Sequence, residues 1–237
     1  MIKPDWNKYY QQEHIVKRFL PDEDPYEELR VEMVKSLLKN VEGVSSILDV
    51  GCGDGYLCHV FRKELGQTVV GVDISYERMR FARANFPGVE YIQGRVYDLP
   101  IKKRTFDLVT LIEVLEHLEN PSQAIAELRR VSRTYILITV PYKRKLKKIL
   151  CPHCFNAFNI DGHIQCFDEP RLLELCERNN IILVNFRKQY ISSTWEKRSI
   201  FRHLPLSVKN QFKSLLVKTR FMRPQKPKYL GILGRIE

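Results

Sequence analysis

The feature that most constrains the fold of this chain is an alternation of short apolar runs with longer amphipathic segments, which starts at residue 46. The apolar runs have the length of buried strands, and we expect strands at Ser46–Val50, Val69–Val72, Val89–Ile92, Phe106–Ile112, Thr134–Val140 and Ile181–Arg187. The segments between them predict helices at Tyr56–Leu65, Tyr76–Asn85, Pro121–Val131 and Glu169–Asn179. Strands that alternate with helices form a parallel sheet covered on both faces, here a doubly wound, Rossmann-like α/β layer with right-handed crossovers.

The segments outside this alternation suggest how the chain is divided. Residues 1–45 are expected to form an N-terminal helical cap, because apolar residues before residue 40 recur at helical spacing. Residues 46–237 would form the main domain, and Tyr229–Ile236 would complete its mostly parallel, seven-stranded sheet with a last, antiparallel strand. Two long connections are expected to be functional additions, an insertion at 143–168 and a basic helical insertion at 192–228.

Composition narrows the classes of function. The 237 residues are 44% hydrophobic and 28% charged, which is the balance of a soluble globular protein, and no apolar run is long enough to span a membrane. The N-terminal residues lack the apolar core of a secretory signal, so we expect a cytoplasmic protein with reduced cysteines. The net charge of +11 favours an anionic partner, namely a phosphorylated or nucleotide-linked metabolite, a nucleic acid or an acidic membrane surface.

The most specific motif is the loop after the first strand, Asp49-Val50-Gly51-Cys52-Gly53-Asp54-Gly55. Glycines at this place let the backbone turn tightly and approach a ligand at the edge of the sheet. The dinucleotide fingerprint requires glycine at position 56, where this chain has Tyr56. The carboxylates of Asp49 and Asp54 would repel a pyrophosphate and attract a ligand that carries a sulfonium and an amino group.

A second motif, Gly71-Val72-Asp73-Ile74-Ser75, ends the second strand. A carboxylate at the position of Asp73 can bind both hydroxyls of a ribose, and Ile74 can pack on an adenine face. With Phe106-Asp107-Leu108-Val109 and Glu113-Val114-Leu115-Glu116-His117-Leu118, these motifs resemble the class I S-adenosylmethionine-dependent methyltransferases, of the type 11 kind with a Cys-x-x-Cys and Gly-His insertion. The resemblance covers roughly Leu37–Arg187.

The resemblance implies that S-adenosyl-L-methionine is the cofactor. The residues that it implies for cofactor binding are Asp49, Gly51, Cys52, Gly53, Asp73, Ile74, Val96 and Glu113. The chain departs from the family at Arg95, which stands where an acid commonly contacts the adenine amino group. Two alternatives remain open at this point: the backbone of Val96 holds the adenine alone, or Asp98 replaces the missing acid.

Two histidines are the candidates for catalysis. Methyl transfer from a sulfonium is an in-line displacement that needs alignment, desolvation and sometimes a base, and His117 or His163 would be that base. The alternative for His117 is a buried histidine bonded to the adjacent turn. A further alternative is a metal site of Glu113, Glu116, His117 and His163 at the reacting hydroxyl, which resembles small-RNA 3′-terminal 2′-O-methyltransferases. Those enzymes commonly carry a second histidine a turn upstream, which Ile160-Asp161-Gly162-His163 lacks.

The insertion also contains a cluster of cysteines. Cys151, Cys154, His163 and Cys166 have residue types that form tetrahedral zinc sites, and such an ion would stabilise a loop with little core of its own. The alternative is free thiols and a His163 that lines the substrate pocket, as in methyltransferases with a similar Gly-His. The lysines of 143–148 would bind an anionic acceptor or simply form a solvated turn.

The basic segment near the C-terminal end contains the pattern of an amphipathic helix, with Val208, Phe212 and Leu215 on one face. Packing against its own domain is favoured over binding to an anionic membrane. The sequence as a whole predicts a methyltransferase that modifies a hydroxyl, amine or carbon of a small, anionic metabolite, such as a sugar derivative, quinone precursor or natural-product intermediate. The alternatives are an RNA methyltransferase and a non-catalytic, methyltransferase-like binding protein.

Overall fold

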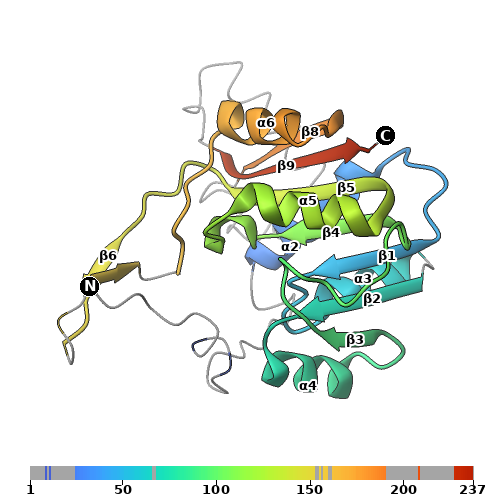
Figure 1. Cartoon of the computed structure of the whole chain (residues 1–237), viewed down its shortest axis with the longest axis horizontal. Helices are drawn as coiled ribbons and strands as arrows, with labels where there is room; N and C mark the ends of the chain where they lie inside the picture. The colour runs from blue at the N-terminus through green and yellow to red at the C-terminus, as the bar shows by residue number, and fades with distance from the viewer. Residues whose placement is uncertain are drawn as a thin grey trace.

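The computed structural model describes residues 25–65, 68–152, 157–159, 162–190 and 227–236, together with Tyr9, Gln11, Phe155 and Val208. In these ranges seven strands form one sheet in the order β3-β2-β1-β4-β5-β9-β8 (Figure 1). The strands are β1 (Ser46–Val50), β2 (Thr68–Asp73), β3 (Glu90–Gln93), β4 (Phe106–Ile112), β5 (Ser132–Pro141), β8 (Ile182–Tyr190) and β9 (Pro227–Arg235).

The direction of the strands agrees with the sequence prediction. The five neighbouring strands β3, β2, β1, β4 and β5 pair in parallel. Strand β9 lies between β5 and β8 and is antiparallel to both. The predicted Rossmann-like, mostly parallel, seven-stranded sheet with an antiparallel last strand is therefore confirmed.

Helices cover both faces of this sheet (Figure 1). They are α2 (Pro25–Leu38), α3 (Tyr56–Leu65), α4 (Tyr76–Asn85), α5 (Pro121–Val131) and α6 (Glu169–Arg178). Three of them begin at a polar cap: the side chains of Ser75, Asn120 and Asp168 each accept a hydrogen bond from a backbone N–H in the first turn of α4, α5 and α6. These caps place the start of each helix.

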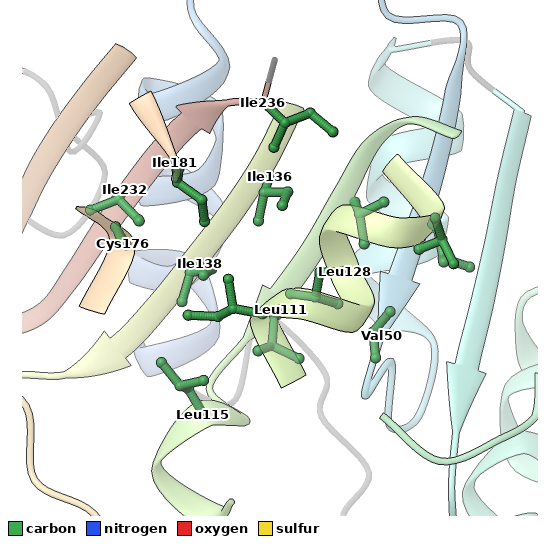
Figure 2. Close-up of a cluster of buried hydrophobic side chains, with 14 of the residues drawn as sticks. Val50, Leu111, Leu115, Leu128, Ile136, Ile138, Cys176, Ile181, Ile232 and Ile236 are labelled. Atoms are coloured by element: carbon green, nitrogen blue, oxygen red, sulfur yellow. The ribbon is translucent and has the colours of Figure 1, made fainter. Parts of the chain in front are cut away.

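Each face of the sheet has its own hydrophobic core, because successive residues of a strand point to opposite faces. Helices α5 and α6 pack on one face, and Figure 2 shows Leu128 of α5 above Leu111 of β4 and Ile138 of β5. Helices α2, α3 and α4 pack on the other, where Leu37 and Phe61 are buried against Ile47. Helix α2 is thus part of the same core as the sheet, and the boundary proposed at residue 45 stays a prediction.

The sequence did not predict a small hairpin of β6 (Lys148–Leu150) and β7 (Ala157–Asn159), which pair antiparallel. The hairpin projects away from the main sheet (Figure 1). The chain leaves and rejoins the sheet at one point, because Tyr142 forms a bridge with Phe167 and the Lys143 N–H donates to Phe167 O at 2.7 Å. The hairpin and its flanking segments therefore form an appendage to the carboxyl end of β5.

Among the described residues no helix is long and apolar enough to cross a membrane. The basic insertion predicted at 192–228 lies outside the described residues, apart from Val208 and the first residues of β9. Its helix and its packing stay predictions.

Candidate active site

The glycine loop lies at the carboxyl edge of the sheet, where β1 ends. The Gly51 and Cys52 N–H groups donate to Val72 O at 2.7 and 3.1 Å, so the loop is fixed to the end of β2. Gly51 has φ of +75°, and a Cβ there would stand 2.4 Å from a methyl of Val114. Only glycine fits this place, and the loop is consequently packed against the turn that follows β4.

Asp73 ends β2 beside this loop, as the sequence predicted. Its Oδ2 accepts a hydrogen bond from the Gly53 N–H and its Oδ1 accepts one from the Ser75 N–H, both at 2.8 Å. An ionised carboxylate has about four lone-pair sites, so two remain for ribose hydroxyls. Ile74, the predicted adenine neighbour, follows directly and is half-buried.

Asp49 lies beneath the loop rather than on its surface, with 2% of its area exposed. Its carboxylate accepts hydrogen bonds from Thr110 Oγ1 at 2.6 Å and Cys58 Sγ at 3.4 Å. Burial raises the pKa of Asp49 to about 6, against the hydrogen bonds and the positive charge of Arg30 in α2. Asp49 therefore places a readily protonated carboxylate directly under the loop.

The turn after β3 contains the departure from the family pattern. The Gly94 N–H donates to Asp73 O at 3.0 Å, and the Asp98 N–H donates to Arg95 O at 3.0 Å. The side chains of Arg95 and Asp98 are exposed, whereas Val96 is half-buried against the core. The turn is thus adjacent to Asp73, and each of the two adenine alternatives stays a prediction.

A second group of polar residues lies just beyond the end of β4, around the short 3-10 helix η2 (Leu115–His117). Glu113 adopts φ of +55° and accepts a hydrogen bond from Thr139 Oγ1 at 3.0 Å. Burial raises the pKa of Glu113 to about 7, while the charges of Arg30, Lys228 and Arg144 oppose this rise. The pKa of Glu116 is raised further, first by burial and then by the negative charge of Glu113.

The two candidate histidines lie together in this group. The rings of His117 and His163 meet edge to face with centroids 4.6 Å apart. His163 Nε2 is 3.8 Å from Glu116 Oε1, and both residues are buried. One atom each of Glu116, His117 and His163 lies within 4.8 Å of the others, which is the one cluster of metal-ligand type among the described residues.

The zinc prediction is not tested by this arrangement. Cys154 lies outside the described residues, and Cys151 and Cys166 are half-buried, reduced and not members of the cluster. The described contacts of His163 are instead with Glu116 and His117. These three residues are three of the four in the alternative metal site.

Sequence reasoning missed the cations around this group. Arg30 comes from α2 and Lys228 from β9, and their charges act on Glu113. Arg144 lies in the lysine-rich run noted above, but nothing in that run distinguished it. Electrostatic effects between segments this far apart leave no local signal in one sequence.

The fold is shared with solved Rossmann-like methyltransferase structures. Residues 48–135 match the family described as "Methyltransferase domain". The chain is 31% identical over 127 residues to the demethylmenaquinone methyltransferase of Chlorobaculum tepidum, which covers 51% of this chain and 52% of that protein. It is 36% identical over 93 residues to the norajmaline N-methyltransferase of Rauvolfia serpentina, covering 37% and 32%. The chain spans 27% to 52% of the length of the curated relatives that it matches.

Solved structures share the fold at low identity. An S-adenosylmethionine-dependent methyltransferase from Aquifex aeolicus aligns with a TM-score of 0.59 at 17% identity, covering 93% of this chain and all of that one. The [4+2]-cyclase SpnF aligns with a TM-score of 0.58 at 17% identity, covering 87% and 79%. Residues 48–135 thus match a methyltransferase domain and the chain shares its fold with solved methyltransferases, while a shared fold leaves the reaction to be argued from the site.

Proposed function

We propose that this protein transfers a methyl group from S-adenosylmethionine to a small, anionic acceptor. The observation that carries the proposal is Asp73, whose two oxygens are held by the Gly53 and Ser75 N–H groups at the end of β2. This fixes a carboxylate beside a loop without side chains at Gly51 and Gly53.

The chemistry of the donor set fits this cofactor. Asp54 lies in the loop, Asp73 is bonded to it and Asp49 lies beneath it, and carboxyl groups at these places suit a ligand bearing a sulfonium and an ammonium and disfavour a diphosphate. When bound, the cofactor supplies an electrophilic methyl group on sulfur. The protein's part is then to orient the ribose through Asp73 and to exclude water through the packed glycine loop.

The acceptor is proposed to lie on the side of Glu113 and His117. His117 and His163 are the groups that would take a proton from an acceptor hydroxyl or amine, and Glu116 stands beside His163. The charges of Arg30, Arg144 and Lys228, which act on Glu113, support an anionic acceptor.

A quinone precursor is one acceptor that fits, since one relative is named a demethylmenaquinone methyltransferase. Sugar derivatives and natural-product intermediates fit the same charges. The RNA methyltransferase alternative rests on the basic insertion at 192–228, nearly all of it outside the described residues, and no described feature favours it.

The test is calorimetric binding of S-adenosylmethionine to the full chain and to Asp73→Ala. Hydrogen bonds to a charged group contribute about 1.5–3 kcal/mol, so we expect affinity to fall about 10- to 150-fold. Glu177→Ala, which removes an exposed carboxylate of α6, should bind like the wild type. Equal affinity of the wild type and Asp73→Ala, or no binding to either, would overturn the proposal.

A further inference from the structure

The hairpin of β6 and β7 has no hydrophobic core of its own. It consists of two strands and projects away from the main sheet (Figure 1). Among the described residues, neither core of the main sheet includes one from 143–159. An isolated two-stranded hairpin is only marginally stable in water, because it has no third element to pack against. The hairpin therefore presents two faces that are not covered by the part of the chain that the structure describes.

Large apolar side chains near the tip of this hairpin are exposed. Leu150 is 60% exposed and lies opposite Ala157, in the last strand pair before the turn. Phe155, in that turn, is 72% exposed, and its N–H donates to Cys151 O at 2.9 Å. Ile149 is exposed on the other face, since successive residues of a strand point to opposite faces. The tip thus presents apolar surface on both faces and in the turn.

Positive charge is concentrated at the base of the hairpin. Residues 142–160 contain four lysines and one arginine, and no aspartate or glutamate. Lys145, Lys147 and Lys148 are exposed, and Lys148 begins β6 at the end away from the turn. A strand rises about 3.3 Å per residue, so Lys148 and Leu150 are about 7 Å apart along the strand. The cations and the exposed apolar side chains therefore occupy two successive levels of one projection.

We propose that this hairpin docks the protein on a bilayer surface rich in acidic phospholipids. Leu150 and Phe155 at the tip enter the boundary between headgroups and acyl chains, to a depth of about 5–10 Å. Lys147 and Lys148 then lie at the level of the lipid phosphates, where each cation adds to the attraction. Because the hairpin leaves the sheet beside Tyr142, just after β5, docking brings the carboxyl edge of the sheet toward the membrane.

The chemistry of the hairpin favours a membrane over a second copy of this chain or a nucleic acid. A second copy brings a further net charge of +11, and a symmetric contact sets the same lysines against each other. A nucleic acid would pair its phosphates with the lysines and stack its bases on aromatic rings, which leaves Ile149 and Leu150 unused. A bilayer with acidic headgroups binds the cations and covers the apolar tip at once.

The test measures sedimentation of the full chain with vesicles of phosphatidylcholine alone, or of phosphatidylcholine with an equal amount of phosphatidylglycerol. We expect the chain to bind the acidic vesicles, and to bind them more weakly as salt is added. One cation near an acidic surface contributes about fivefold in affinity, so the double variant Lys147→Gln, Lys148→Gln should bind about 30-fold more weakly. Leu150→Ser should weaken binding at least about fivefold, because it removes apolar area that enters the bilayer.

The controls are matched in charge and in exposure. The double variant Lys102→Gln, Lys103→Gln removes two exposed lysines from the segment before β4 and lowers the net charge by the same amount. Leu183→Ser changes an exposed leucine of β8, away from the hairpin. Both controls should bind acidic vesicles like the wild type. Circular dichroism of every variant separates loss of docking from loss of the fold.

Absence of binding to acidic vesicles by the wild type overturns the proposal. So does wild-type binding by both hairpin variants, or an equal loss in the hairpin and control lysine variants, since the charge then acts from elsewhere. Binding of single-stranded RNA in place of acidic vesicles makes the hairpin a nucleic-acid surface. A dimer that Leu150→Ser dissociates, in place of vesicle binding, makes it a contact between copies. Either of these last two results also overturns the proposal.

Discussion

The proposed cofactor side and the proposed acceptor side of the carboxyl edge are constructed in different ways. The cofactor side joins Gly51, Gly53 and Asp73 by hydrogen bonds between the ends of two paired strands. The acceptor side joins η2 to His163, with the hairpin appendage between them in the chain. The cofactor side is thus a local product of the sheet, whereas the acceptor side depends on docking a distant segment. This suggests that changes to the appendage alter the acceptor more than the cofactor.

The largest effect is expected for Gly51→Ala. The new Cβ would clash with Val114 at 2.4 Å, so the loop must move, and we expect at least a 100-fold loss of S-adenosylmethionine affinity. Gly43→Ala is the matched control, because Gly43 has nearly the same φ, +74°, with nothing within 4 Å of a Cβ. Backbone strain should lower the free energy of unfolding in urea by about 1–2 kcal/mol in both variants. Only Gly51→Ala should lower the affinity for S-adenosylmethionine. Equal affinities would show that the loop is not the binding element.

Phe167→Ala tests the docking on the acceptor side. Phe167 is 1% exposed, and its truncation should lower the free energy of unfolding by about 3–5 kcal/mol. Hydrogen exchange should rise at residues 162–167, while S-adenosylmethionine affinity changes less than about threefold, provided that measurements stay below the unfolding temperature. Phe155→Ala, at an exposed position of the appendage, should change stability by less than about 0.5 kcal/mol. If S-adenosylmethionine affinity fell well beyond threefold while hydrogen exchange rose at residues 162–167, the separation of the two sides would be contradicted.

Asp107 lies at the start of β4, at the end of the sheet opposite the proposed site. Asp107→Ala therefore tests whether a change far from the carboxyl edge leaves cofactor binding unaffected. Burial acts to raise the pKa of Asp107, but hydrogen bonds from Ser45, Ser46 and Arg133 hold it well below its usual range. Stability from this group is present above about pH 4, the unfolded value, and declines as pH falls below it. At pH 7 we expect a loss of about 2–3 kcal/mol in urea unfolding with unchanged cofactor affinity. Glu42→Ala, an exposed carboxylate, is the control, and an affinity change would contradict the expectation.

The smallest effect is a pH dependence on the cofactor side. Asp49 has a pKa of about 6 in the free protein, and a cationic ligand favours its ionised form, so the complex has a lower pKa. Affinity for S-adenosylmethionine should therefore fall as pH drops below 6, by at most about tenfold per pH unit. Calorimetry between pH 5 and 8 checks this, and Asp49→Asn should give a flatter profile. A wild-type affinity independent of pH would show that Asp49 does not sense the ligand's charge.

Most of the fold was predictable because each element has a local pattern. The ends of β1, α3, α4, β4 and α5 agree with the sequence prediction, and β3 and α6 differ by one residue. The hairpin was missed because β6 is exposed throughout, and a strand with no buried face has no alternation to detect.

The two sides of the site also differed in how far the sequence could predict them. The glycine loop and Asp73 are contiguous motifs with fixed spacing, so one sequence suffices to predict their neighbourhood. The contact between Glu116 and His163 crosses 46 intervening residues, and Arg30 approaches from a helix before the first strand. Both histidines were found as candidates, but their meeting depends on how the appendage returns to β5.

The position of β9 has a consequence for the order of events on the ribosome. Among the described strands, β8 pairs in the main sheet only with β9, which is made after it. Until residues 227–235 have emerged, β8 has no hydrogen-bonding neighbour in the sheet, and the apolar β5 edge lies open to other strands. Completion of this half of the sheet therefore waits until residues 227–235 have been made, and a nascent chain halted at residue 226 would present an attractive surface for chaperones.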